Sequence, residues 1–71
     1  MIVQSVLIPR DRYSLSEAKR WIKNHNFTMR YKGKAVDITE NYYRFRQHKP
    51  VKDSKYRVVR LNNDILIILM G

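Results

Sequence analysis

Aromatic rings and cations alternate along residues 42 to 48. Tyr42, Arg44, Arg46 and His48 follow one another at every second position, and in a β-strand such residues point to the same side of the sheet. Aromatic rings stack on nucleic-acid bases, and guanidinium groups pair with phosphates. The segment therefore predicts a face that binds a polyanion. Solvated sheet surfaces also carry arginines packed on rings, so a purely structural role for each arginine stays open.

Cations in neighbouring segments extend this predicted nucleic-acid-binding set. Arg57 or Arg60 would extend it along an adjacent strand, and Lys19, Arg20 and Lys23 lie on the flank of a predicted helix. Further charge is available from Arg10, Arg12, Lys32, Lys34, Lys49, Lys52 and Lys55.

The charge balance supports an anionic partner. Fifteen Lys and Arg against six Asp and Glu leave a net charge of +9 on 71 residues. Such an excess destabilises a compact chain by self-repulsion, and a polyanion relieves that repulsion. Nucleic acid, with DNA preferred, and an acidic protein are the partners that fit. No helix-turn-helix or zinc-finger pattern is present, so contacts to backbone phosphates are expected to dominate over base reading.

Catalysis finds little support in the chain. The six carboxylates are dispersed, and local salt bridges explain the nearest pair, Asp37 and Glu40, better than a metal does. His25 and His48 have no Cys or second His at ligand spacing. We therefore expect no enzymatic activity, no metal, no cofactor and no small-molecule substrate.

Composition favours one folded domain spanning residues 1–71. The hydrophobic fraction of 44% is too high for a disordered tail, and the absence of cysteine excludes a disulfide scaffold. The N-terminal residues lack the pattern of a secretory signal, and the final apolar run is too short to span a bilayer. We expect no membrane association.

The pattern of residues predicts an α+β fold. Ser14 and Glu17 form a capping box before an amphipathic helix over residues 15–25. The segment 27–39 fits either a short strand or an extended loop. Strands are expected over residues 2–8, 41–48, 56–61 and 65–70. One helix would then pack on a small antiparallel sheet, in the order strand, helix, strand, strand, strand.

The last predicted strand is apolar on both faces, although one helix can cover only one face of a sheet. Either the sheet curls into a small barrel, or a second copy of the chain covers the surplus surface. The second alternative predicts a homodimer. Its interface would consist of Ile65, Leu66, Ile67, Ile68, Leu69 and Met70.

Two stretches, LSEAKRWIKNHNF at 15–27 and VDITENYYRFRQ at 36–47, carry a resemblance. They resemble a small virion-associated domain of unknown function, with a VDxTENxYRFRQ motif, seen near phage prohead protease and scaffold proteins and in large DNA viruses. Ile38 stands where that domain usually has an acidic residue. The matching residues are Trp21, Lys23, His25, Phe27, Thr39, Glu40, Asn41, Tyr43, Arg44, Phe45, Arg46 and Gln47.

As a separate, strongly basic chain, the protein looks like a small virion protein of Marseillevirus-type giant viruses. The resemblance implies no catalytic residue. It implies a place in the virion, and in the host cytoplasm or nucleus during infection, next to capsid or packaged DNA. Two hypotheses result: a non-enzymatic viral protein that binds nucleic acid for genome packaging, or a module that docks an acidic capsid or scaffold protein.

Overall fold

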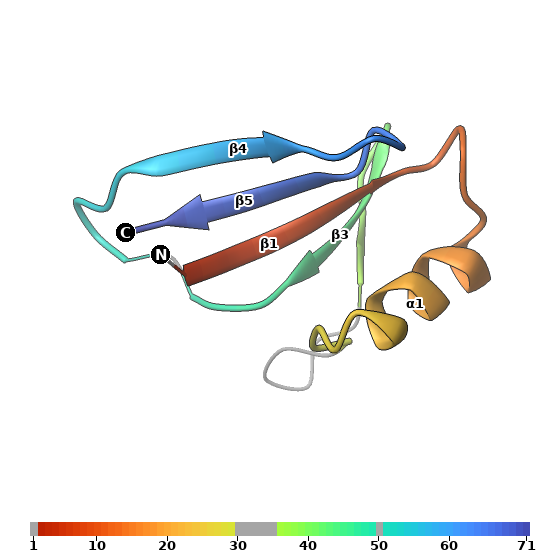
Figure 1. Cartoon of the computed structure of the whole chain (residues 1–71), viewed down its shortest axis with the longest axis horizontal. Coiled ribbons are helices and arrows are strands. Elements are labelled where there is room, and N and C mark those ends of the chain that lie inside the picture. The colour runs from red at the N-terminus through yellow and green to blue at the C-terminus, as the bar shows by residue number, and fades with distance from the viewer. Residues whose placement is uncertain (1, 30–35, 50) are drawn as a thin grey trace.

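One helix and five strands make up the chain, as the computed structural model shows for residues 2–29, 36–49 and 51–71 (Figure 1). This confirms the predicted α+β class. In the segment 27–39, whose sequence fits either a strand or a loop, residues 27–29 are not in a strand and a two-residue strand is present at Asp37–Ile38. Residues 30–35, with Lys32 and Lys34, lie outside the described residues. The elements are β1 (Ile2–Pro9), α1 (Leu15–Asn24), β2 (Asp37–Ile38), β3 (Tyr42–Arg46), β4 (Tyr56–Arg60) and β5 (Leu66–Met70).

The five strands form one open antiparallel sheet in the order β2-β3-β1-β5-β4. β1 lies in the centre and pairs with β3 on one side and β5 on the other. β2 and β4 are the two edges, and Tyr56 and Val58 of β4 are exposed instead of closing over the first strand. The barrel alternative is therefore wrong.

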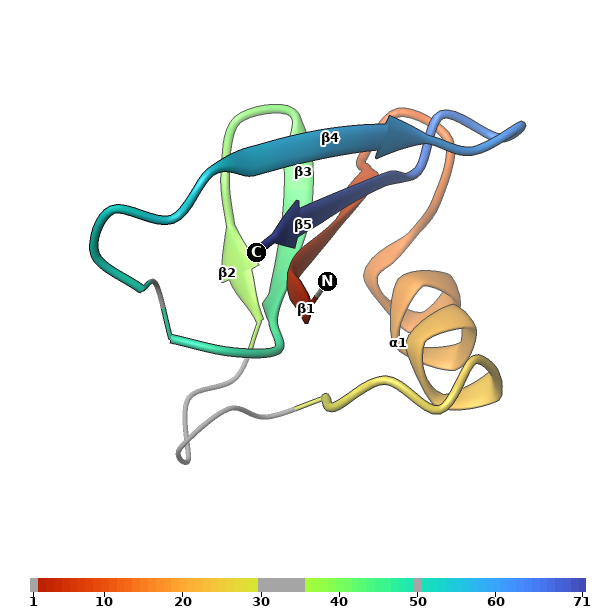
Figure 2. The ribbon, with the colours of Figure 1, turned by 60° about the vertical axis from the view of Figure 1, so that its left-hand side comes forward.

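The core lies between α1 and the β1–β3 half of the sheet. Val6 and Ile8 of β1 are fully buried, as are Ala18 and Ile22 of α1. Phe45 of β3 is 1% exposed and belongs to the same cluster. The two views agree that α1 lies beside β1 and away from β4 (Figures 1 and 2).

The helix begins where the capping box predicted. The backbone N–H of Glu17 donates to Ser14 Oγ at 3.2 Å, and the backbone N–H of Ser14 donates to Glu17 Oε1 at 2.9 Å. These two bonds satisfy N–H groups that have no partner inside the helix. The helix ends at Asn24, one residue before the expected end, because Asn26 turns into the left-handed region with φ 60°.

The strand predicted over residues 41–48 ends at Arg46. The backbone N–H groups of Gln47 and His48 both donate to the carbonyl of Gln4, at 2.8 and 3.2 Å, and this shared acceptor breaks the regular ladder. The Gln47 side chain turns to Thr28, whose backbone N–H and carbonyl it bonds at 2.6 and 2.7 Å. Alternation along β3 therefore stops before His48.

Neither face of the β4–β5 half is fully covered. All five residues of β4 are exposed, and four of the five in β5 are half-buried. On one face Val58 is 58% exposed, and on the other Val59 is 37% exposed. The single helix covers only part of one face, so the excess apolar surface expected for the last strand extends to β4.

Replacing Ser14 by Ala removes the cap and is expected to lower the free energy of unfolding by about 1 kcal/mol. For a domain of this size the melting temperature would fall by roughly 4–8 °C. Ser16→Ala is the matched control, because this exposed serine lies inside the helix, where alanine is favoured. Thermal unfolding followed by circular dichroism would contradict the capping role if both variants melted alike.

The capping box also predicts a pH dependence. The pKa of Glu17 is lowered from 4.5 because its carboxylate accepts hydrogen bonds from the Ser14 backbone N–H and side chain and lies near Arg20. Because the pKa of Glu17 is lower in the folded chain than in the unfolded chain, the carboxylate stabilises the fold at pH values above its ordinary pKa. This contribution disappears as the pH falls through the lowered pKa of the folded state. Urea unfolding should show a Glu17→Gln deficit near neutral pH that shrinks at about pH 3. A pH-independent deficit would contradict this.

Candidate functional site

Tyr42, Arg44 and Arg46 lie together on the sheet face that α1 does not cover. Tyr43 and Phe45 between them belong to the core under the helix, and successive side chains of a strand point to opposite faces. The sequence pattern therefore placed these three residues on one surface, as the structure has them. All three are half-buried.

The rest of this surface comes from β1, β2, β4 and β5. Cross-strand pairing sets Arg44 opposite Leu7, Leu7 opposite Leu66, and Leu66 opposite Arg60. An apolar strip thus separates the arginines of β3 from the arginine of β4. We call this surface the helix-free face. By the same pairing it includes Ile2, Ser5, Leu7, Asp37, Tyr42, Arg44, Arg46, Tyr56, Val58, Arg60, Leu66, Ile68 and Met70.

A buried polar pair positions Arg44. Gln4 and Ser5 are 2% and 0% exposed, and the register between β1 and β5 shifts at this point. The Ser5 hydroxyl donates to Gln4 Oε1 at 2.5 Å, and the Gln4 amide donates to the His48 carbonyl at 3.2 Å. The Arg44 guanidinium donates to Ser5 Oγ at 3.3 Å and to Gln4 Oε1 at 3.4 Å. These contacts orient one edge of the guanidinium toward the sheet.

The cations on β3 are not neutralised by carboxylates in the described part of the chain. Its two ion pairs both use Asp64, which contacts Arg12 at 2.9 Å and Arg60 at 2.8 Å. Asp37 faces Arg44 across the strand pair without forming an ion pair. The Nε of Arg46 is buried and has no hydrogen-bond partner among the residues that the structure describes. Arg44 and Arg46 therefore bring positive charge to the helix-free face.

The remaining predicted binding residues lie elsewhere. Arg57 pairs with Leu69 and so points to the helix-bearing face, which leaves Arg60 as the β4 cation of the helix-free face. His48 lies beyond the end of β3, and its Nδ1 is 2.8 Å from the Lys49 carbonyl oxygen. Lys19, Arg20 and Lys23 are exposed on α1, whose buried residues turn toward the sheet. The sequence-predicted set is thus divided between opposite sides of the molecule.

The predicted dimer residues are only partly accessible. Ile65 and Met70 are 0% and 2% exposed within one chain, so their side chains offer almost no surface to a second copy. β5 itself is an interior strand between β1 and β4. The segment from Leu66 to Leu69 is half-buried. The exposed strand of this hairpin is its neighbour β4, because β4 forms the edge of the sheet.

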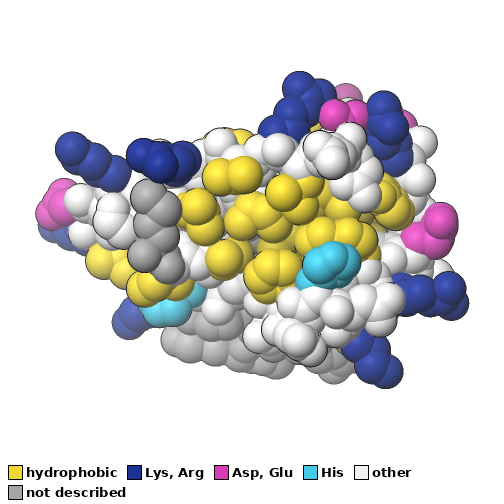
Figure 3. Space-filling model, in the orientation of Figure 1, with side chains coloured by type: hydrophobic (Ala, Val, Ile, Leu, Met, Phe, Trp, Pro, Cys, Tyr) yellow, Lys and Arg dark blue, Asp and Glu magenta, His cyan; other side chains and the backbone are white. Residues whose placement is uncertain are grey.

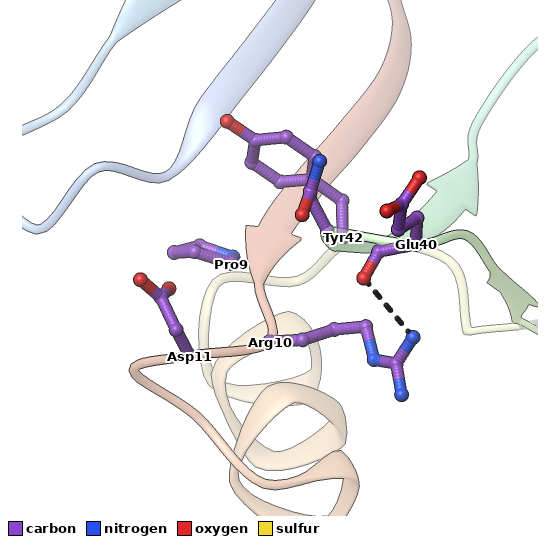
Figure 4. A pocket seen from close by; sticks show the side chains of 6 residues that line it. Pro9, Arg10, Asp11, Glu40 and Tyr42 are labelled. Carbon is purple, nitrogen blue, oxygen red and sulfur yellow. Dashed lines mark hydrogen bonds between the residues drawn. The ribbon is translucent and has the colours of Figure 1, made fainter.

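A hollow of about 310 Å³ lies where β1 leaves the sheet, beside Tyr42 (Figure 4). Arg10 spans it and donates to the carbonyls of Thr39 and Glu40 at 2.6 and 3.2 Å. Asp11 also lines the hollow. The guanidinium of Arg10 already donates to backbone carbonyls, and the acidic residues Asp11 and Glu40 line the same hollow. The hollow therefore does not suit a phosphate.

Surface charge surrounds apolar surface on the side of the molecule shown in Figure 3. Hydrophobic side chains gather there over β1 and β5, and Lys and Arg side chains lie around the margin. On this side of the molecule the cations therefore lie along the margin and do not form one central patch (Figure 3). Sequence reasoning missed the supporting role of Gln4 and Ser5. The sequence feature that could have indicated this role is the presence of two adjacent polar residues in an otherwise apolar strand.

The described residues contain no group of three or more His, Cys, Asp or Glu side chains arranged to hold a metal ion. Within the same residues, no helix has the length and apolar character needed to cross a membrane. Comparison with protein-family models, curated proteins and solved structures found no match.

Gln4→Leu tests the polar support beneath Arg44. The change leaves the Ser5 hydroxyl and the His48 carbonyl without this partner, so urea unfolding should show a loss of about 1–3 kcal/mol. Adding Ser5→Ala removes the second acceptor of the Arg44 guanidinium, so the double variant should be less stable than Gln4→Leu alone. A double variant that is as stable as Gln4→Leu, or more stable, would contradict this account.

Proposed function

We propose that the protein binds nucleic acid through the helix-free face, without reading base sequence. The observation that carries this proposal is the position of Arg44 and Arg46. They lie two residues apart on one strand, with no carboxylate paired to them in the described residues, and Gln4 and Ser5 accept hydrogen bonds from Arg44. A chain of net charge +9 thus places two guanidinium groups without carboxylate partners in the described residues on one face, and one of them, Arg44, is held in position by hydrogen bonds.

The face offers two kinds of contact. Arg44 and Arg46 can pair with phosphates along the strand direction, because charge-assisted bonds from guanidinium to phosphate are strong and directional. Tyr42 and Tyr56 provide rings at two corners of the same face, and Tyr56 is 50% exposed. Bases stack on such rings without regard to sequence. A single strand, whose bases are free to stack, fits this face better than a duplex.

The link to a virion and to genome packaging comes from the sequence resemblance alone. It is consistent with a basic, non-enzymatic chain that coats nucleic acid. It remains a prediction about where the protein acts.

Docking of an acidic protein is the second candidate. The observation in its favour is the apolar strip of Leu7, Leu66 and Ile68 between the arginines. Protein interfaces typically combine an apolar centre with a polar rim in which arginine is enriched. An acidic capsid or scaffold protein would place carboxylates over Arg44 and Arg46.

Fluorescence anisotropy with labelled single-stranded and duplex oligonucleotides of random sequence tests the first candidate. Arg44→Gln with Arg46→Gln should weaken binding about tenfold or more and reduce the salt slope, which is about 0.7 per phosphate contact for single strands. Lys19→Gln with Lys23→Gln removes the same charge from the helix side. We expect this matched control to weaken binding less.

The comparison of the two double variants decides the site. A larger effect of the helix pair would move the binding surface to α1. Absence of binding by the unaltered protein at low salt would reject nucleic-acid binding and leave the acidic-protein candidate. Circular dichroism of each variant checks that the fold is retained.

A further inference from the structure

β4 is a free edge strand. It closes one end of the sheet, and all five of its residues are exposed. At the opposite edge, β2 has only two residues. Natural edge strands are usually short, bulged, covered or charged, because a long free edge pairs with another chain. β4 carries Arg57 and Arg60, which oppose only those pairings that set them against each other or against themselves. β4 has the length of an ordinary strand and carries exposed Val58 and Val59.

The hydrogen bonds to β5 show which backbone groups of β4 point outward. Leu61 N–H donates to the Ile65 carbonyl at 2.8 Å, and Gly71 N–H donates to the Lys55 carbonyl at 3.2 Å. Along an antiparallel pair, residues alternate between bonding the partner strand and pointing away from it. Lys55 and Leu61 point inward, so the backbone N–H and C=O groups of Tyr56, Val58 and Arg60 point away from β5.

We propose that β4 pairs with β4 of a second copy, antiparallel and centred on Val58. In this register Val58 lies opposite Val58 of the other copy, Tyr56 opposite Arg60, and Arg57 opposite Val59. The three outward-facing residues all meet outward-facing residues, and every residue of β4 has a partner. The arrangement is a two-fold symmetric interface, in which each contact occurs twice.

The side chains fit this register. On the helix-free face, each Arg60 lies beside the ring of Tyr56 from the other copy, and such cation–aromatic pairs across strands are stabilising. Asp64 already holds the edge of the Arg60 guanidinium, at 3.0 Å from Nε, which leaves its flat face open to a ring. On the helix-bearing face, Arg57 lies opposite Val59 of the second copy, so the two Arg57 side chains do not face each other.

The neighbouring registers fit less well. A shift that centres the pair on Arg57 sets two like charges directly opposite each other, which destabilises a strand pair. A shift that centres it on Val59 leaves Tyr56 opposite the turn residue Asn62. Sliding one strand past the other by an odd number of residues would place outward-facing backbone groups opposite inward-facing ones. The register centred on Val58 is therefore the one that the strand selects.

Pairing of this kind joins the two sheets into one, with the two-fold axis perpendicular to the sheet. Both helix-free faces then lie on the same side and form one continuous surface. The proposal stands without nucleic-acid binding, since it depends only on β4. The two also respond oppositely to salt: screening weakens contacts to phosphate and relieves repulsion between two chains of charge +9.

Disulfide trapping tests the contact, because the chain has no cysteine of its own. Residues opposite each other in a hydrogen-bonded antiparallel pair have Cα atoms about 5.5 Å apart, within the range of a disulfide. Val58→Cys should form covalent dimers under mild oxidation about tenfold faster than Ile38→Cys. Ile38 is the matched control, 55% exposed on the other edge. Equal rates would overturn the proposal.

The register has its own test. A mixture of Tyr56→Cys and Arg60→Cys should form a mixed disulfide, whereas Tyr56→Cys alone should not dimerise covalently, because its two copies lie about 13 Å apart along the strands. Covalent dimers of Tyr56→Cys alone would overturn this register.

Sedimentation of the unaltered protein tests self-association without a crosslink. The fraction of dimer should rise as salt shortens the screening length from about 10 Å at 0.1 M to about 3 Å at 1 M. Val58→Lys should abolish the dimer, and Ile38→Lys should leave it unchanged. A mass of one chain at all salt and protein concentrations would overturn the proposal, whatever the anisotropy experiments show.

Discussion

The structure depends on the packing of a short helix against one half of a sheet. Ala18 and Ile22 of α1 contact a layer in which Val6, Ile8 and Phe45 are almost completely buried. Burial of apolar side chains is the dominant favourable contribution to folding. A ten-residue helix cannot reach across five strands, so the β4–β5 hairpin is held mainly by its pairing with β1. The exposed apolar surface of the molecule is a direct result.

The same packing gives the sheet two different faces. On β3, Tyr43 and Phe45 turn into the core, and Arg44 and Arg46 consequently turn outward. Burying the polar pair Gln4 and Ser5 at the register shift in β1 supplies acceptors for Arg44. A half-buried guanidinium needs such partners, since a buried polar group without them is costly. The alternation of side chains along β3 therefore determines both which residues pack in the core and which face carries the arginines.

Two proposals use different parts of this architecture. Nucleic-acid binding uses side chains on the helix-free face, whereas self-association uses backbone groups on the free edge of β4. They meet at Tyr56, Val58 and Arg60, which belong to the face and also to the proposed strand pair. Joining two copies would place two sets of β3 arginines on one surface. A polyanion that spans both copies would then bind more tightly through its raised local concentration.

Local sequence determined the helix start at Ser14, the single helix and the common face of Tyr42, Arg44 and Arg46, because capping and alternation act between residues close in the chain. Tertiary structure alone decided the strand order, the exposed edge at β4 and the choice of Arg60 over Arg57 for the helix-free face. It also excluded His48 from the alternating row, through the bonds of residues 47 and 48 to Gln4. β1 pairs with β3 and β5, which are far from it in the chain, and no local pattern encodes these two pairings.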